Sequence, residues 1–421
     1  MALRIRGFTL IDGTGAPPLT DAALAIDDNG LIAAVGRDRE ISTATLPTAE
    51  LNLEGRTLLP GLIDAHVHLV FSAGDDPRSD ILAESDDQLF DRAATNAQSL
   101  LRAGVTLTRD CGGRGAVTQR LRDAIASGEV VGPRILSSGA PITTPQGHLH
   151  FMGLIATGVD GVVEAVRHQV RAGVDFVKVM ASGGNMTPGS NPRIAQFSEP
   201  ELKAMVDEAH QHGRLVAAHV HSTDSIQRAF HAGVDTFEHC SWLAPEGASL
   251  DEGLLKEMAK RRAVVSPAVG NTFRTPPEAL SPDPSRQAFV REFQKTRFRL
   301  GRAMHEAGVP LILGTDAGVR LTRFEDYALA FPIFVERFGL TPMQAIQAAT
   351  SRAAAAIGVA NEVGTIQVGK QADLVVLDGD PLSDLSAFGR IHLVFRRGRR
   401  VVEAGSVVHR NVNGQTPGGR R

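Results

Sequence analysis

Apolar and polar residues alternate in short runs from residue 3 to residue 53, a spacing that predicts β-strands rather than helices. Turn-forming groups such as Asp28, Asn29 and Gly30 separate these runs, as they do in small antiparallel β modules. The same pattern returns after residue 364, in TIQVGKQADLVVLDGDPL and IHLVFRRGRRVVEAG. We therefore predict β-structure at both ends of the chain.

Between these ends, short apolar runs alternate with longer segments of helical spacing. The phrases RAGVTLT, RAGVDFV, HAGVDTF and EAGVPLI mark junctions where a helix ends in Ala-Gly and an apolar strand follows. Alternation of strands and helices predicts an α/β fold, with a (β/α)8 TIM-like barrel as its architecture. The predicted strands are 58–63, 105–109, 134–138, 176–180, 215–219, 236–239, 264–267 and 311–315. The predicted helices are 86–103, 164–172, 199–212, 223–232, 250–261 and 286–307, followed by 341–357.

The two β segments are most simply the halves of one domain, because the ends of a chain often lie close together. We expect residues 1–57 and 358–410 to form a composite small β domain, a β-sandwich. Residues 58–357 then form the barrel. Residues 411–421 are rich in Gly, Asn and Pro, and we expect them to be a flexible tail.

The composition is typical of a soluble globular protein, with 43% hydrophobic and 22% charged residues among 421. A formal net charge of -3 provides no positive field of the kind that nucleic-acid binding requires, and a solvated strand end or subunit contact explains the arginine run at 396–400. Residues 1–20 hold no continuous apolar segment, and no later window is apolar enough to span a membrane. We expect a cytoplasmic protein that binds neither nucleic acid nor membranes.

The two cysteines, Cys111 and Cys240, each follow an apolar run and do not form a C-x-x-C pair. This arrangement indicates neither a disulfide framework nor a thiolate zinc site. We interpret both as small buried apolar residues.

Candidate chemistry begins at the run LLPGLIDAHVHL, which contains His66 and His68. On a strand, residues two apart point to the same face, so this pair directs two imidazoles at one point. The pair alone is equally compatible with a polar strand face. Downstream, however, His219, His239 and Asp316 each close a short apolar run. In a barrel these ends share one face, where histidines and an aspartate are suited to hold one divalent ion or two.

Lys178 lies inside the apolar run FVKVMASGG. A lysine in an apolar strand cannot be left charged and unpaired without a large desolvation cost, so it must be neutral, paired or modified. A neutral amine can add carbon dioxide to form a carbamate, an anionic group that is able to bridge two metal ions. The alternative is an amine that extends to the barrel mouth or pairs with an acid.

Taken in order, the motifs LPGLIDAHVH, FVKVMASGG, AHVHS, DTFEHC and GTDAG, followed by ADLVVLDGDP, resemble the amidohydrolase superfamily. Within it the chain is most similar to the binuclear branch that contains metal-dependent prolidase-like dipeptidases and ochratoxin-degrading amidohydrolases. The resemblance extends from residue 3 to about residue 410, and the ordered set of motifs is highly specific.

The resemblance implies a centre of two divalent metal ions, expected to be zinc. It makes His66 and His68 ligands of one ion and His219 and His239 ligands of the other. A carboxylated Lys178 would bridge the two ions. Two further histidines would face the substrate or polarise its carbonyl, and an aspartate would ligate metal and shuttle protons; these residues are His148, His221 and Asp316.

The reaction that the resemblance implies is hydrolysis of a carboxamide C–N bond by a metal-bridging hydroxide. Arg193 and Arg320 are candidates to bind a substrate carboxylate as a charged fork. We therefore expect a small-molecule substrate, an N-acyl amino acid or a dipeptide, including ochratoxin-like amides. Many relatives assemble through the barrel or the small β domain, so we also expect a homo-oligomer.

Three alternatives stay open on the sequence. A deaminase of the superfamily would keep the H-x-H pair and the aspartate, but such enzymes usually lack the bridging lysine, so Lys178 argues against it. A hydrolase of cyclic amides, such as hydantoin-like or imidazolone rings, is chemically compatible. A non-catalytic scaffold should have lost ligands, whereas here all six positions are filled.

Overall fold

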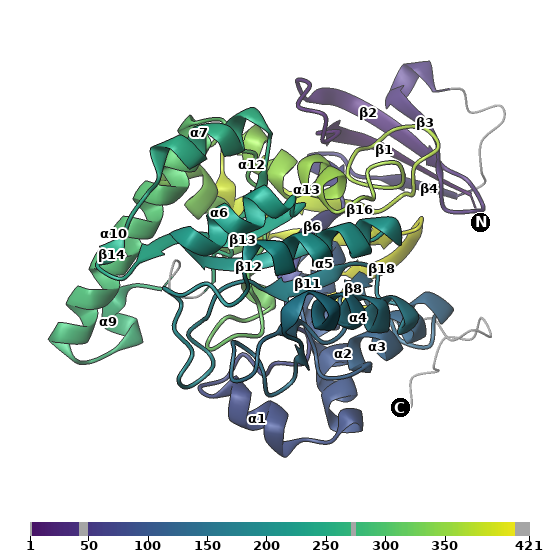
Figure 1. Cartoon of the computed structure of the whole chain (residues 1–421). Helices are drawn as coiled ribbons and strands as arrows, with labels where there is room; N and C mark the ends of the chain where they lie inside the picture. Colours follow the sequence, from purple (N-terminus) through teal and green to yellow (C-terminus); the bar gives the residue numbers. More distant parts are fainter. Residues whose placement is uncertain (1, 42–48, 271–274, 409–421) are drawn as a thin grey trace.

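The computed structural model describes residues 2–41, 49–270 and 275–408, and the predicted tail at 411–421 lies outside these ranges. Strands and helices alternate through the middle of the chain, and strands predominate at both ends (Figure 1). Within the described ranges, we find no helix with both the length and the apolar character needed to cross a bilayer.

Strands from both ends of the chain form one nine-stranded sheet, and Figure 1 shows the purple N-terminal strands on the same side of the molecule as β16 and β18. The central contact is antiparallel, between β5 and β16. In spatial order the strands are β19 (Ser406–Val407), β18 (Arg399–Glu403), β17 (Ile391–Arg396), β16 (Leu374–Asp378), β5 (Arg56–Pro60), β1 (Leu3–Leu10), β2 (Leu19–Ile26) and β3 (Ile32–Arg37), with β4 (Ala49–Asn52) paired to β1.

The two faces of this sheet pack into different cores. Along β16, Leu374 and Val376 join a core made of residues from both chain ends, while Val375 and Leu377 join the large core of the rest of the molecule. Side chains alternate between faces along a strand, so an uninterrupted apolar run supplies both cores. The sheet is therefore attached to the rest of the molecule by a continuous apolar face.

The strands of the middle region are mainly parallel and form two sheets. One contains β6 (Leu62–Val67), β7 (Val105–Asp110) and β8 (Arg134–Ser137). The other follows the order β10 (Leu154–Ile155), β9 (Ile142–Thr143), β11 (Val177–Met180), β12 (Val216–Ser222), β13 (Thr236–Ala244) and β14 (Gly247–Ala248), with β15 (Val264–Ser266) paired to β13.

Backbone contacts connect these two sheets on both sides. On one side, the Asp175 N–H, just before β11, donates to the carbonyl of Ser137 at the end of β8. On the other side, the segment 311–317 forms parallel bridges to β15 and to β6. The carboxyl ends of the strands are thereby brought to one edge.

Helices follow most of these strands and begin at recognisable capping residues. Ser85 before α2 and Ser198 before α5 each form a capping box with a residue three positions later, and so does the residue before α12. The helices are α1 (Pro77–Ala83), α2 (Asp86–Arg102), α3 (Val117–Ser127), α4 (Gly158–Arg171), α5 (Glu199–Gln211), α6 (Thr223–Ala232), α7 (Glu252–Lys260), α9 (Pro277–Leu280), α10 (Pro284–Glu306), α11 (Ala330–Pro332), α12 (Pro342–Ala348) and α13 (Ser351–Ala356).

The strand predicted at 58–63 is two strands, because the chain changes sheets at Gly61. The Gly61 N–H donates to the carbonyl of Asp373, and β6 begins at the next residue. A Cβ atom at Gly61 would lie 2.0 Å from the Thr106 hydroxyl oxygen, so a side chain does not fit there. The transition between the sheets thus depends on a glycine.

Two other predictions also needed correction, and one helix was not among those named. The segment 311–315 is not a regular strand, because the Leu313 N–H donates to Ala348 instead of to a neighbouring strand. The helix predicted at 341–357 is interrupted between α12 and α13, where Thr350 has φ -138° and ψ -98°. Helix α3 was not predicted, although its buried Val117, Leu121 and Ile125 recur at helical spacing.

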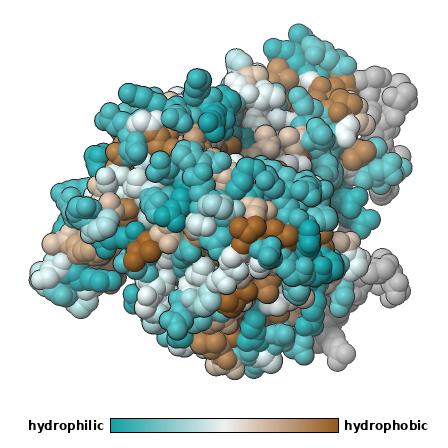
Figure 2. Space-filling model, in the orientation of Figure 1, coloured by the Kyte–Doolittle hydropathy of each residue, from teal (hydrophilic) through white to brown (hydrophobic). Residues whose placement is uncertain are grey.

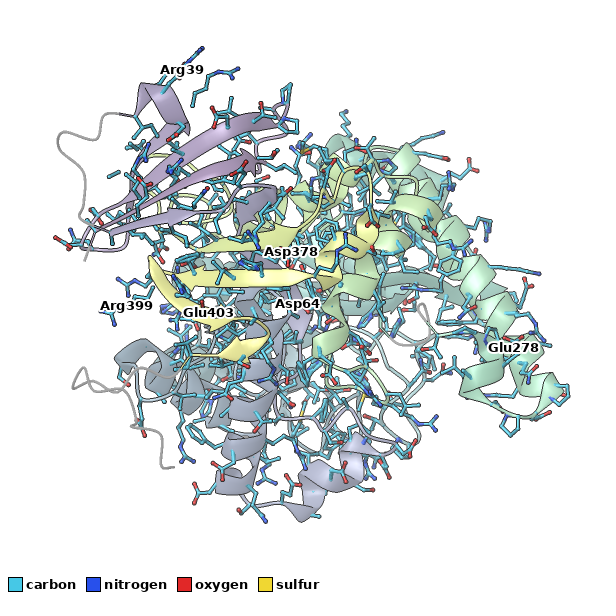
Figure 3. All side chains as sticks on the ribbon, turned by 180° about the vertical axis from the view of Figure 1, so that it is seen from behind. Arg39, Asp64, Glu278, Asp378, Arg399 and Glu403 are labelled. Atoms are coloured by element: carbon cyan, nitrogen blue, oxygen red, sulfur yellow. The ribbon has the colours of Figure 1, made fainter. Side chains whose placement is uncertain are left out.

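The arginine run at 396–400 lies on the hairpin of β17 and β18, and Figure 3 labels Arg399 and Glu403, the two end residues of β18. Arg400 forms an ion pair of 2.8 Å with Glu403. Arg396 donates to a backbone carbonyl. These contacts engage part of the run within the chain itself.

Candidate metal centre

The polar residues at the strand ends converge on one region. His66 lies on β6, Lys178 on β11, His219 on β12 and His239 on β13. Asp316 lies within the bridged segment 311–317 beside β6, and its N–H donates to the carbonyl of His66 at 2.8 Å. Because these strands are parallel, side chains near their carboxyl ends can reach a shared point.

His66, His68 and Asp316 form a first group, whose candidate ligand atoms all lie within 4.8 Å of one another. The Asp316 Oδ1 atom is 3.4 Å from His66 Nε2 and 3.5 Å from His68 Nε2. These distances are long for hydrogen bonds. The three atoms instead face a common point.

His219, His221 and His239 form a second group with the same spacing. Their ring centroids are 4.5 to 4.6 Å apart in every pair. His66 joins the two groups, since its ring centroid lies 5.2 Å from that of His239. The sequence assigned His221 to the substrate, whereas the geometry places it beside the two predicted ligands.

Lys178 is close enough to both groups for its charge to act on histidines of each. Its side chain is 1% exposed, and its Nζ atom has no hydrogen-bond partner among the residues that the structure describes. Burial, and after it the charge of Lys178, lower the pKa of His66 to about 4. The same two causes act on His68, His219, His221 and His239, whose pKa values lie well below the ordinary value.

Hydrogen bonds to the Nδ1 atoms hold His66 and His68 in place. His66 Nδ1 is 2.8 Å from a carboxylate oxygen of Glu238, and His68 Nδ1 is 2.8 Å from the carbonyl of Gly112. With Nδ1 engaged, the Nε2 atoms face Asp316. Such outer partners fix the tautomer and orientation of metal-binding histidines.

The second group is held in a comparable way. His221 Nδ1 is 2.6 Å from the Ser241 hydroxyl, and the His221 N–H donates to Ser182. His219 Nε2 is 3.2 Å from the carbonyl of Gly183, which leaves its Nδ1 available. Both imidazoles therefore keep one nitrogen for another ligand.

Glu238 also belongs to a buried ion pair. One of its carboxylate oxygens accepts a hydrogen bond of 2.5 Å from Arg109, whose Nε donates to the carbonyl of Ala65. Burial alone would raise the pKa of Glu238, but the charge of Arg109 and the hydrogen bond from His66 outweigh it and hold the pKa well below its ordinary value. Glu238 is thus an anion that orients His66.

Backbone conformation at two of these positions is unusual. Asp316 has φ 60° and His239 has φ 72°, in the left-handed region that non-glycine residues rarely adopt. Asp64 supports the backbone before Asp316 by accepting hydrogen bonds from the N–H and the hydroxyl of Thr315. Strained residues of this kind tend to occur at functional sites.

The donor set fits divalent metal ions. Three of its polar atoms are buried without a hydrogen-bond partner in the described structure, namely His66 Nε2, Lys178 Nζ and Asp316 Oδ1. Neutral imidazole and carboxylate are ligands that zinc and similar ions accept. The lowered pKa values keep the histidines neutral at pH 7, as coordination requires.

His148 is buried beside this set, with its ring centroid 4.6 Å from that of His219. Its Nδ1 lies 3.2 Å from the Thr187 hydroxyl. Burial and the Lys178 charge lower its pKa to about 3, so the ring is neutral.

The structure places the two predicted carboxylate-binding arginines on exposed loops. Arg193 donates to the carbonyl of Ala244, and Arg320 donates to the carbonyl of Asp75. Each guanidinium is therefore already partly engaged by its own surroundings.

Both cysteines are free and buried, as expected. Burial raises the pKa of Cys111 to about 12. Cys111 lies near His66 and Glu238, but the Glu238 carboxylate is engaged by Arg109, so this third group is less suited to a metal ion.

Reasoning from the sequence missed the buried pair of Arg109 and Glu238. A signal was present, since each is a charged residue inside an apolar strand, like Lys178. The contacts of Ser241 and Thr187 carry no comparable signal, because hydroxyl residues are common at strand ends and in loops.

A model of the amidohydrolase family matches residues 57–401 of the chain. The chain is 33% identical to ochratoxinase of Aspergillus niger over 410 residues, a match that covers 90% of this chain and 82% of that protein.

Solved structures of amidohydrolase-type enzymes are also similar to this chain. The crystal structure of a Xaa-Pro dipeptidase with bound methionine in the active site is similar with a TM-score of 0.85 and 27% identity, covering 95% of this chain and 99% of that one. Ochratoxinase of A. niger is similar with a TM-score of 0.82 and 30% identity, covering 96% of each chain. These neighbours imply a TIM-barrel-like α/β fold, in agreement with the sequence prediction at that level.

Replacing Asp316 by Asn should stabilise the metal-free protein at pH 8. Burial raises the folded-state pKa of Asp316 to about 7, above the ordinary 3.8, so the charged form destabilises the folded state increasingly as the pH rises from about 4 to about 7. Because the side chain is 16% exposed, we expect a gain on the order of 2 kcal/mol at pH 8, and much less at pH 4. Urea unfolding with a chelator measures the gain.

Asp87→Asn is the matched control, because this aspartate is exposed and forms an ion pair with exposed Arg120, and its effect should stay within about 0.5 kcal/mol. If metal-free Asp316→Asn is less stable than the wild type at pH 8, the burial cost of this charge has been misjudged.

Glu238→Gln should lower the free energy of unfolding by about 3–5 kcal/mol, because it leaves Arg109 charged and unpaired in the interior. Glu403→Gln breaks an exposed pair with Arg400 and should cost less than about 1 kcal/mol. Urea titrations of both variants measure the free energy of unfolding. An equal loss in the two variants would show that the buried pair stabilises the fold no more than the exposed one.

Proposed function

Because the chain belongs to the amidohydrolase family, we propose that it hydrolyses the carboxamide C–N bond of a small N-acyl amino acid or dipeptide at the candidate metal centre. It is a hydrolytic enzyme of a family that acts on amide or peptide bonds. The observation that carries the proposal is the convergence of five buried or half-buried imidazoles, the unpaired Lys178 amine and the Asp316 carboxylate.

In this proposal the centre holds two divalent ions, expected to be zinc. His66 and His68 would hold one ion and His219 and His239 the other, with Asp316 as a further ligand. When bound, the ions would supply Lewis-acid chemistry, activating water near neutral pH and polarising the scissile carbonyl.

Lys178 would bridge the ions as a carbamate. The buried amine lacks a partner in the described structure, which is costly for a charged group. Carboxylation converts it into an anion that complements the surrounding imidazoles and the ions they hold. The alternative of an amine that extends to solvent is disfavoured by its 1% exposure.

Asp316 would move the proton. Its Oδ1 atom faces His66 and His68 and has no hydrogen-bond partner in the described structure, so the carboxylate is available to accept and return a proton. It would take the proton from the attacking water and deliver it to the leaving amine. Neutral His148 and His221 would orient the substrate, donating hydrogen bonds to the carbonyl oxygen as negative charge develops there.

Substrate class is proposed from the neighbourhood of the site and from the relatives. Arg193 and Arg320 lie on exposed loops and would bind a substrate carboxylate after exchanging their present backbone partners. The relatives named ochratoxinase and Xaa-Pro dipeptidase act, by those names, on ochratoxin and on dipeptides, and they support this class.

We also propose the division of the chain that the sequence predicts. Residues 1–57 and 358–410 would form the small β domain, a β-sandwich, and 58–357 the closed (β/α)8 barrel. The shared nine-stranded sheet and the links between the two parallel sheets support this division. A cytoplasmic location and a homo-oligomeric state stay predictions from the sequence.

Asp316→Asn should retain most of the bound metal and lose at least about a hundredfold in turnover, because the amide cannot shuttle a proton. Metal content by mass spectrometry and hydrolysis of a panel of N-acyl amino acids, dipeptides and cyclic amides test this together. Near-normal turnover would exclude the shuttle role. Cleavage confined to cyclic amides would replace the proposed substrate class.

Lys178→Ala should lose metal and activity together, because it removes the bridging group. Lys203→Ala is the control, since Lys203 is exposed and paired with Asp207, and it should keep both properties. Full metal retention in Lys178→Ala would contradict the bridging role.

A further inference from the structure

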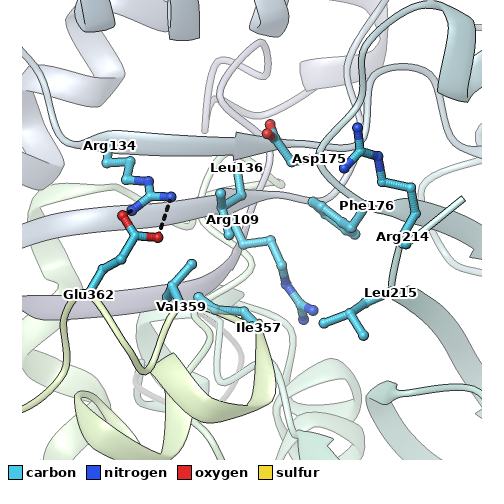
Figure 4. Close-up of a pocket in the computed structure, with 12 residues that line it drawn as sticks. Arg109, Arg134, Leu136, Asp175, Phe176, Arg214, Leu215, Ile357, Val359 and Glu362 are labelled. Carbon is cyan, nitrogen blue, oxygen red and sulfur yellow. Dashed lines mark hydrogen bonds and ion pairs between the residues drawn. The ribbon is translucent and has the colours of Figure 1, made fainter. Parts of the chain in front are cut away.

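A cavity of about 260 Å³ lies at the opposite ends of the parallel strands from the histidines. Residues at the start of β8, residues just before β11 and β12, and the turn after α13 line this cavity (Figure 4). We call it the basal pocket. Its lining comprises Arg109, Arg134, Leu136, Asp175, Phe176, Gly213, Arg214, Leu215, Ile357, Gly358, Val359 and Glu362.

Most charges around the basal pocket are already neutralised. Arg134 donates two hydrogen bonds to Glu362, at 2.9 and 3.3 Å, drawn as dashed lines in Figure 4. Asp175 pairs with Arg122 outside the pocket. Arg109 pairs with Glu238, also outside it.

Arg214 is the exception. Its guanidinium has neither an ion pair nor a hydrogen bond within the described ranges, and its Nε atom is buried without a partner. Figure 4 shows its side chain at the pocket with no dashed line. A half-buried guanidinium left in this state favours an anion, because a planar fork of N–H donors matches a carboxylate.

The rest of the lining is apolar. Leu136, Phe176, Leu215, Ile357 and Val359 form its walls. Figure 4 shows these side chains around the same space as the arginines. An apolar wall with a few convergent polar groups is the usual composition of a small-molecule site, and the volume lies just below the usual range for drug-sized ligands, as suits a small molecule.

We propose that the basal pocket is a second binding site, for a small carboxylate that carries an apolar group. The Arg214 guanidinium binds the carboxylate, and the aliphatic and aromatic walls take the apolar group. A bare inorganic anion would leave these walls unfilled. This site goes beyond the proposed hydrolysis and depends on neither the metal ions nor the Lys178 carbamate.

The pocket is nevertheless adjacent to the support of the metal centre. Arg109 forms part of its inner lining, with its guanidinium carbon 5.2 Å from the Phe176 ring centre. On its other side Arg109 holds Glu238, which orients His66. The two sites thus share one buried arginine while occupying opposite ends of the strands.

Calorimetric titration of 3-phenylpropionate into the full-length, metal-loaded protein tests the proposal. Arg214→Gln should weaken binding about tenfold or more, the effect of removing a charge-assisted hydrogen bond. Arg214→Lys, which keeps the charge but not the fork, should bind with intermediate affinity. Arg120→Gln, a change at an exposed pair with Asp87, should bind like the wild type.

Hydrolysis of an amide substrate by Arg214→Gln should stay at the wild-type rate, which shows that the variant is folded and separates the basal pocket from the metal centre. Equal affinity of the wild type and Arg214→Gln for 3-phenylpropionate would overturn the proposal, and so would absence of binding to the wild type at millimolar ligand. Either result leaves the proposed hydrolysis intact.

Discussion

Burial of groups that would normally be hydrated is the constraint on which the site depends. The Lys178 amine, which is 1% exposed, a cluster of imidazoles with lowered pKa values, and the Asp316 carboxylate with one unpartnered oxygen lie together. In water each would be stabilised by solvent, and in this interior each needs a partner. Divalent ions would satisfy the imidazoles and the carboxylate, and also the amine once it is carboxylated, which explains why so many polar atoms are kept together in an apolar environment.

The layer beneath the histidines fixes their geometry. Arg109 and Glu238 form an ion pair that is buried away from solvent, and Glu238 holds the Nδ1 atom of His66. Asp64 holds Thr315 and so supports the strained backbone of Asp316. Each of these residues lies on or beside a strand of the parallel sheets, so the fold itself positions the ligands.

Much of the fold and the site could be predicted from the sequence, because apolar periodicity marks strands and helices, and polar residues at strand ends stand out. His66, His68 and Lys178 were identified in this way, and α6 was predicted with its observed bounds. Other features depend on tertiary contacts that spacing does not encode. The Leu313 N–H donates to Ala348, which interrupts the regular strand pairing of this segment. The basal pocket likewise arises from loops that are distant in sequence.

The number of metal ions per chain tests the central claim most directly, that the histidines, Lys178 and Asp316 form one binuclear hydrolytic centre. It is measured by inductively coupled plasma mass spectrometry on protein purified without chelator. The predicted result is two divalent ions per chain, expected to be zinc. A protein that is folded and hydrolyses amides with no bound metal would contradict the claim.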